Sequence, residues 1–275
     1  MSKFEVTEEH IRTYEEDGVV LLRGGIDLKW IEILNRGCDK DLAEPGPHVE
    51  IYDQSKAGTL FFNDFDLWRH IPEMKQFAFE GPCAEIAGQL TRSNKINFFL
   101  DHLFVKEPGT TLPTHWHQDQ PYMAIDGRQV CSNWIPLVPI SEERTVEFVR
   151  GSHKWERWFA PVDSFKDGSR HPSKVFERVP EIEADRDDYD IVFWSLEPGD
   201  VLFFQGLTVH QGRANPTADK PRRTFTHRWL GDDARFTLRD PPAEFPKWPT
   251  DLKSGDSFDR DPQFPRLWER AAKAA

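Results

Sequence analysis

The 275-residue sequence has few cysteines, no long apolar run and a shortage of positive charge, and each lack excludes a class of protein. The three cysteines, Cys38, Cys83 and Cys131, are scattered and have no CxxC spacing. This pattern predicts reduced thiols in a cytoplasmic protein rather than a disulfide-stabilised secreted one. No apolar run approaches the roughly 18 residues that cross a bilayer, and the first residues lack the apolar core of a signal peptide. We therefore expect a cytoplasmic protein without a membrane segment.

The charge balance is acidic. Lys and Arg number 35 against 47 Asp and Glu, which gives a formal net charge of -12. A chain of this charge repels nucleic-acid phosphates and anionic lipid, so we expect neither a nucleic-acid partner nor a membrane partner. Hydrophobic residues make up 38% and aromatic residues 13%, which is enough to bury a core. The remaining expectation is a globular protein that acts on a small molecule.

Regular secondary structure changes type along the chain. Apolar spacing predicts helices over about 7–17, 28–42 and 72–90, with a short buried strand at Gly18–Gly25. From Asn97 onward, short segments rich in β-branched and aromatic residues are bounded by Pro, Gly and Asp, which predicts an all-β sandwich or barrel. The seven segments are INFFLDHLFVK, QVCSNWIPLVPI, TVEFV, DIVFWSL, DVLFFQ, LTVHQG and RTFTHRWL.

These patterns predict one domain over residues 1–275, mainly β with flanking helices. Its expected parts follow one another along the chain: a helical N-terminal part at about 1–95, a β core at about 96–232, a polar lid-like insertion within it at about 163–189, and a proline-rich tail at 240–275 that ends in a helix over Pro265–Lys273.

The segment THWHQDQPY places His115, His117 and Asp119 at alternate positions. Alternate residues of a strand share a face, so these side chains can converge on one cation. Two imidazoles and one carboxylate leave open coordination positions, as non-haem Fe(II) needs to bind oxygen and a co-substrate together. The best distant candidate for a further ligand is His210, in EPGDVLFFQGLTVHQGRAN.

Two metal sites are compatible with these histidines. In the first, His115 and His117 are both ligands, as in cupins, and the spacing from Gly109 fits that pattern, although the Glu that cupins have four or five residues after the second histidine is missing. In the second, His117, Asp119 and His210 form the triad, and His115 lies beside the ligands or faces the substrate.

The strand PRRTFTHRW favours the triad, because a dicarboxylate co-substrate needs a fixed cation and guanidinium grips carboxylate in a bidentate fork. Arg222 with Thr224 is our first choice for that clamp, and Arg223 is the second. Strand alternation divides the segment into two faces, with Arg222, Thr224, Thr226 and Arg228 on the polar one and Arg223, Phe225, His227 and Trp229 on the other.

Five motifs in order resemble the phytanoyl-CoA dioxygenase family of iron(II)/2-oxoglutarate oxygenases. They span about Asp17 to Trp229 and read DGVVLLRG, LFVKEPGTTLPTHWHQDQPY, NWIPLVPISEERTVEFVRGSHKW, EPGDVLFFQGLTVHQGRAN and the PRR strand. The resemblance implies a double-stranded β-helix, the cupin-like jelly-roll, with helical flanks. It also implies that His117, Asp119 and His210 are the metal ligands, that Arg222 binds 2-oxoglutarate, and that Trp134 lies near this co-substrate.

The function implied is a dioxygenase that uses Fe(II), 2-oxoglutarate and O2 to hydroxylate an unactivated C–H bond, with release of succinate and CO2. Because halogenase relatives replace the metal aspartate, Asp119 favours hydroxylation. The charge of -12 suits a polar, zwitterionic or cationic small metabolite better than an anionic acyl-CoA. Candidate substrate contacts are His115, Tyr122 and Lys106. Two alternatives remain: a cupin-type isomerase or dioxygenase that uses His115, and a jelly-roll binding protein without catalysis.

Overall fold

The largest element of the fold is an antiparallel β-sheet. The computed structural model describes residues 4–53, 60–163, 168–169, 173–240 and 242–271. The sheet has eight strands, in the spatial order β1 (Val19–Leu22), β10 (Val201–Gln205), β7 (Val130–Pro136), β12 (Arg222–Leu230), β4 (Lys95–Lys106), β3 (Leu60–Phe65) and β2 (Glu50–Asp53), with β14 (Arg266–Glu269) also paired to β4.

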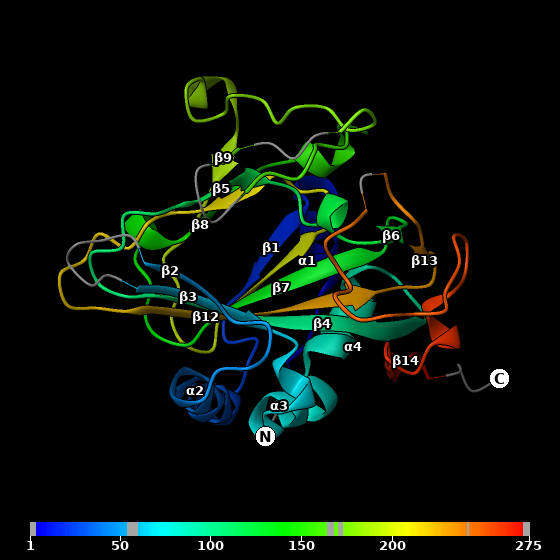
Figure 1. Cartoon of the computed structure of the whole chain (residues 1–275), viewed down its shortest axis with the longest axis horizontal. Helices are drawn as coiled ribbons and strands as arrows, with labels where there is room; N and C mark the ends of the chain where they lie inside the picture. Colours follow the sequence, from blue (N-terminus) through cyan, green and yellow to red (C-terminus); the bar gives the residue numbers. More distant parts are fainter. Residues whose placement is uncertain (1–3, 54–59, 164–167, 170–172, 241, 272–275) are drawn as a thin grey trace.

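A smaller antiparallel sheet lies over one face of the large one (Figure 1). Its strands, in order, are β5 (Thr114–His117), β11 (His210–Gly212), β8 (Val146–Val149) and β9 (Ile191–Val192). A third, two-stranded sheet consists of β6 (Ile125–Asp126) and β13 (Arg235–Phe236). Two facing antiparallel sheets with side chains from both inner faces between them form the jelly-roll expected from the sequence.

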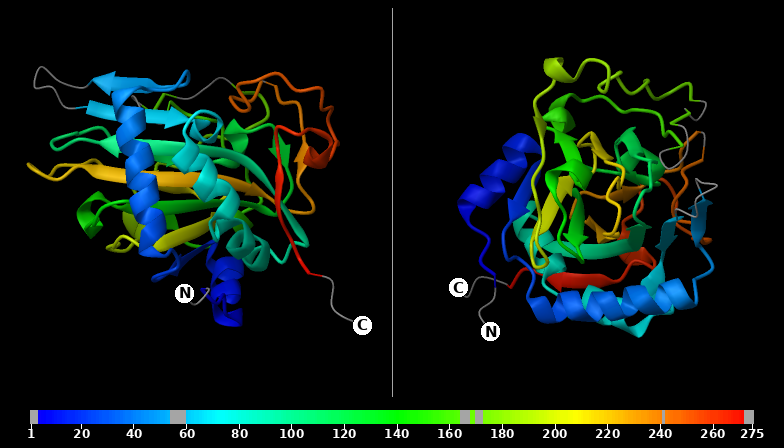
Figure 2. Two further views of the ribbon diagram at one scale, coloured as in Figure 1. Left: turned by 90° about the horizontal axis from the view of Figure 1, so that it is seen from below. Right: turned by 90° about the vertical axis from the view of Figure 1, so that its left-hand side faces the viewer.

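Helices cover the outer face of the large sheet, and α2 crosses its strands (Figure 2). They are α1 (Glu8–Asp17), α2 (Leu28–Ala43), α3 (Pro72–Glu80) and α4 (Cys83–Leu90), close to the predicted ranges. The first helix begins with the Thr7 cap and ends at Gly18, whose φ of 79° a side chain would disfavour. Buried Leu34, Phe77 and Trp229 belong to the apolar core between helices and sheet.

The alternation predicted for β12 decides which side chains enter this core and which enter the interior of the jelly-roll. Phe225, His227 and Trp229 lie in aromatic contact on the helix side. Arg222, Thr224, Thr226 and Arg228 all line the cavity between the two sheets. Strand β12 therefore separates the apolar core on the helix side from the polar cavity between the two sheets.

Three predicted elements differ from the structure. Strands β2 and β3 lie within the part expected to be helical, and DIVFWSL contributes only Ile191–Val192. The helix predicted at Pro265–Lys273 is wrong, because Arg266–Glu269 forms β14 and pairs with the first residues of β4, next to β3 on the same edge. The open edge of a long strand outweighs a weak local helical preference.

The insertion and the tail both reach the cavity. Asp163 and Phe176 from the insertion and Phe245 from the tail line it. Residues 164–167 and 170–172 of the predicted lid lie outside the described residues. Across the described part of the chain, no helix combines the length and apolarity needed to cross a membrane.

Candidate active site

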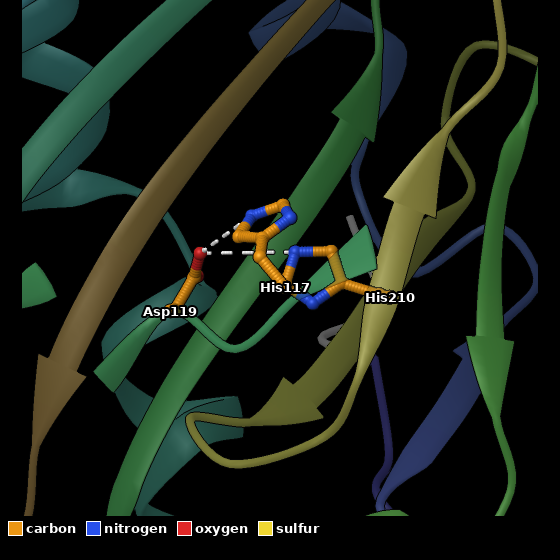
Figure 3. Close-up of side chains that lie close together, drawn as sticks. All are labelled: His117, Asp119 and His210. Atoms are coloured by element: carbon orange, nitrogen blue, oxygen red, sulfur yellow. Dashed lines mark ion pairs between the residues drawn. The ribbon is translucent and has the colours of Figure 1, made fainter. Parts of the chain in front are cut away.

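Two neighbouring strands and the turn after one of them bring the predicted metal residues together. His210 of β11 lies directly opposite His117 of β5 in the antiparallel register. Asp119 follows β5 at the start of the 3-10 turn Gln120–Tyr122. Its Oδ1 lies 3.6 Å from His117 Nε2 and 3.7 Å from His210 Nε2, and the three side chains point toward one another (Figure 3).

The tautomer of each imidazole follows from its backbone partner. His117 Nδ1 lies 2.7 Å from the carbonyl oxygen of His115, and His210 Nδ1 lies 3.0 Å from that of Thr208. A carbonyl oxygen only accepts, so each Nδ1 carries a hydrogen and each Nε2 is the ring nitrogen that faces Asp119. Two ring nitrogens and a carboxylate oxygen therefore converge on one point, where one cation can bind all three.

The surroundings of His210 and Asp119 keep these two residues in metal-binding form. Burial and the neighbouring His117 imidazole lower the pKa of His210 to about 3, so it is neutral. Burial alone would raise the pKa of Asp119, but Arg228 and the two imidazoles hold it well below the usual range. Ser132 Oγ donates to Asp119 Oδ2 at 2.7 Å, and Arg228 Nη2 lies 3.2 Å from the same oxygen.

A cavity of about 450 Å³ opens from this cluster, and Arg222, Thr224 and Trp134 line it as well. Arg222 is buried, and its Nη1 donates to the carbonyl oxygens of Arg144 at 2.8 Å and Arg213 at 2.7 Å. Among the described residues, Arg222 Nε and Thr224 Oγ1 are buried without a hydrogen-bond partner. Buried polar atoms are rarely left unpaired, so these two donors indicate a place for an acceptor.

Burial and the Arg144 guanidinium lower the pKa of Arg222 to about 9, so it stays charged at neutral pH. The second-choice arginine, Arg223, points to the opposite face, where its Nη1 donates to Asp39 Oδ1 at 2.7 Å. The alternation of β12 thus brings only the first of the two into the cavity.

His115 does not share the face of His117, contrary to simple alternation. The register shifts between the pairs His210–His117 and Gly212–Thr114, so β5 contains one extra residue, a β-bulge. Thr114 consequently lines the cavity and His115 does not.

Lys106 also differs from its predicted position as a substrate contact. It lies beside Arg222 in the sheet register and is fully buried. Its ammonium group donates to the carbonyl oxygens of Leu112 at 2.9 Å and Arg213 at 3.3 Å, and it does not line the cavity. These hydrogen bonds depend on how the chain folds, so the sequence alone did not predict them.

Tyr122 does line the cavity, with its ring edge-on to His117 at 5.7 Å between centroids. Its hydroxyl donates to the carbonyl oxygen of Val162 at 2.7 Å and accepts from the Val162 N–H at 2.8 Å. These hydrogen bonds therefore link the start of the insertion to the 3-10 turn that follows Asp119.

Sequence reasoning missed several residues of the site. Arg228 and Ser132 contact Asp119, and His102 and Asn63 form a hydrogen-bonded pair in the cavity wall. Alternation along β12 places Arg228 on the cavity face and is a usable signal. Ser132, His102 and Asn63 lie on strands whose order in the sheet only the fold reveals.

Two imidazoles and a carboxylate fit a ferrous ion, and the unpaired donors across the cavity fit a carboxylate of a bound co-substrate. Within a jelly-roll, this combination defines the class of 2-oxoglutarate-dependent, non-haem iron oxygenases.

The sequence profile of the phytanoyl-CoA dioxygenase (PhyH) family matches residues 14–224. The chain belongs to this family and is a dioxygenase, with Fe(II) as cofactor and 2-oxoglutarate as co-substrate.

Relatives and solved structures agree with this placement. A 1-deoxypentalenic acid 11-beta-hydroxylase of Streptomyces arenae is 25% identical over 76% of this chain and 75% of its own. The carbocyclase SnoK of nogalamycin biosynthesis has a TM-score of 0.76 and 22% identity, covering 96% of this chain and 97% of its own. The epimerase SnoN of the same biosynthesis has a TM-score of 0.72 and 23% identity, covering 95% and 98%. Both structures are similar to this chain in fold.

Proposed function

We propose that this chain hydroxylates a small metabolite and that His117, Asp119 and His210 hold its iron. The observation that carries the proposal is the convergence of two imidazole Nε2 atoms and a carboxylate oxygen in a buried place, with both imidazoles oriented through Nδ1 by backbone carbonyls. We also propose that residues 1–275 act as one oxygenase domain, because the tail and the insertion both complete the cavity. A binding protein without iron would have no use for this converging set of two imidazoles and a carboxylate.

Arg222 and Thr224 are the proposed partners of the distal carboxylate of 2-oxoglutarate. Arg222 Nε and Thr224 Oγ1 would both donate to it, which would satisfy two groups that lack partners within the described structure. Trp134 would form part of the wall beside this co-substrate. Lys106 would act indirectly, because it and Arg222 donate to the same carbonyl oxygen of Arg213 and so hold the arginine in place.

When bound, the iron supplies oxidation of an unactivated C–H bond by O2, coupled to conversion of 2-oxoglutarate to succinate and CO2. The chain's own residues fix geometry. Ser132 and Arg228 hold the Asp119 carboxylate in one orientation, and the two backbone carbonyls hold the imidazoles in the tautomer that leaves Nε2 free for metal. Tyr122 and Trp134 exclude water beside the reacting groups.

The outer part of the cavity supports a polar substrate with a positively charged group. Glu50, Asp163 and Glu244 line it, and Lys247 pairs with Glu244 at 3.2 Å. Burial, the hydrogen bond to Glu50 and the negative fields of Asp163 and Glu244 raise the pKa of Tyr52 well above its usual range, which reflects how close these carboxylates lie.

Phe65, Phe104, Phe176 and Phe245 complete the aromatic wall, which suits an ammonium or quaternary ammonium group. An anionic acyl-CoA would meet like charge there.

The test is succinate release over a panel of amines, betaines and amino acids set against acyl-CoA and dicarboxylate compounds. Cationic or zwitterionic compounds are expected to stimulate turnover, and Glu50→Gln should lower kcat/KM for them without changing Fe(II) binding. Glu107→Gln, outside the cavity lining, is the control. Stimulation by anionic compounds alone would refute the charge assignment and leave the iron assignment intact.

The cupin-type alternative needs His115 as a ligand. The bulge in β5 takes His115 off the cavity face, and this placement favours the triad with His210. His115→Ala is therefore expected to retain iron.

A further inference from the structure

A second group of metal-binding side chains lies on the helix side of the large sheet, away from the cavity. Asp41 is on α2, Asp64 is on β3, and His70 follows the 3-10 turn Leu67–Arg69. Ligand atoms of the three residues all lie within 4.8 Å of one another, and Asp41 Oδ1 is 3.9 Å from His70 Nε2. None of the three lines the cavity, whereas the strand neighbours of Asp64, Asn63 and Phe65, do.

Asp41 lacks the partners that a buried carboxylate needs. Its side chain has no solvent exposure, and apart from the facing Asp64 carboxylate neither of its oxygens has a hydrogen-bond partner among the described residues. Burial and the nearby Asp64 raise the pKa of Asp41. Asp64 is equally buried and accepts the backbone N–H of Gly46 and of Phe65, both at 2.8 Å. Within the same part of the chain, neither aspartate forms an ion pair with a lysine or arginine. Two buried carboxylates facing each other without a cation are unfavourable.

The backbone packs closely against two of the three side chains, and the third gives access to solvent. A Cβ atom at Gly46 would lie 2.6 Å from the His70 ring and 2.8 Å from Asp64 Oδ2, so only glycine allows the chain to pass this close to both side chains. The His70 side chain is 32% exposed, which connects the buried carboxylates with solvent. The separation of 3.9 Å between Asp41 and His70 is too long for a hydrogen bond, but atoms about this far apart can bind the same ion after a small adjustment.

We propose that Asp41, Asp64 and His70 form a second metal site, for a first-row divalent ion such as Zn²⁺ or Mn²⁺. An imidazole with two carboxylates suits these ions, whereas Ca²⁺ prefers oxygen ligands alone. The ion would join α2 and β3 to the segment that leads into α3. Because Asn63 and Phe65 flank Asp64, it would also stiffen one wall of the active-site cavity. The competing state is a proton shared between Asp41 and Asp64.

Metal content after equilibrium dialysis against micromolar Zn²⁺ separates these states without an activity measurement. The wild-type chain is expected to hold two zinc ions, one at each site. Asp41→Asn should hold one, H117A/D119A should hold one, and the combined variant none. Asp39→Asn, on the exposed face of the same helix, is the matched control and should hold two.

Thermal unfolding and a variant at a partly exposed residue distinguish a loss of zinc binding from a loss of folding. In H117A/D119A, Zn²⁺ at a hundredfold excess over its Kd should raise Tm by about 5 °C, and Asp41→Asn should abolish the rise. His70→Gln changes an exposed side chain and should weaken zinc binding at this site by roughly tenfold or more. If H117A/D119A holds no zinc, or if Asp41→Asn and His70→Gln bind it as the parent does, the aspartates share a proton and the proposal is wrong.

Discussion

Arg228 Nη2 lies 3.2 Å from Asp119 Oδ2, and the same carboxylate oxygen accepts from Ser132 Oγ at 2.7 Å. Arg228 is on β12 and Asp119 follows β5, so the contact joins the two sheets at the proposed metal ligands. It leaves the carboxylate ionised and in a fixed orientation, with Oδ1 turned to both imidazoles. The arginine is thus a positioning residue for the proposed ligand set.

Replacing Arg228 by Gln should weaken Fe(II) binding by roughly 10- to 100-fold, the range found when outer partners of metal ligands are removed. Anaerobic Fe(II) titration measures this directly. Arg266→Gln, a strand arginine that pairs with Asp259 on the surface, should bind iron like the wild type. Equal affinity in Arg228→Gln and wild type would mean that Asp119 needs no support from Arg228.

Arg222→Gln should raise KM for 2-oxoglutarate by roughly 10- to 150-fold, because a charge-assisted hydrogen bond contributes about 1.5–3 kcal/mol. Arg223→Gln is the matched control, since its guanidinium pairs with Asp39 on the other face. Turnover with a 2-oxo acid that lacks the distal carboxylate should be insensitive to Arg222→Gln. A raised KM in Arg223→Gln instead would transfer the role to the neighbouring residue.

His227 makes stability depend on pH. It is fully buried among Phe77, Phe98 and Trp229, and burial and the Arg228 charge lower its pKa to about 3. An unfolded histidine titrates near 6.5, so between these values only the unfolded chain takes up the proton. The contribution of neutral His227 to the free energy of unfolding is therefore fully present above about pH 6.5 and is lost as pH falls toward 3.

His227→Phe removes this dependence, since phenylalanine takes up no proton. Urea unfolding at pH 7.5 and pH 4.5 should show that the wild type loses on the order of 2–3 kcal/mol more than the variant between the two values. Equal losses in the two proteins would mean that His227 is protonated in the folded state or that its contribution is cancelled elsewhere.

The sequence predicted the class of chemistry better than the boundaries of the secondary-structure elements. The type of chemistry could be read from His117, Asp119 and the PRR strand because ligand types and strand alternation are local properties. The position of His115 could not be read, because one extra residue in β5 reverses the alternation and only pairing with β11 reveals it. Ser132 and Asn63 were missed because their roles depend on which strands are neighbours in the sheet.

The errors at β3 and β14 have a related cause. Both strands pair with the same edge of β4, and this long-range pairing decides their structure. The segment at 265–273 is short, and an available strand edge determines its conformation where local propensity is weak.

The most direct measurement is the visible spectrum of the protein with Fe(II) and 2-oxoglutarate under anaerobic conditions. If one ferrous ion is held by the imidazoles at 117 and 210 and the carboxylate at 119, and is chelated by the 2-oxo acid, the wild type develops a weak charge-transfer band. Asp119→Ala then lacks the band and releases no succinate. A full band and full succinate release in Asp119→Ala would contradict the account.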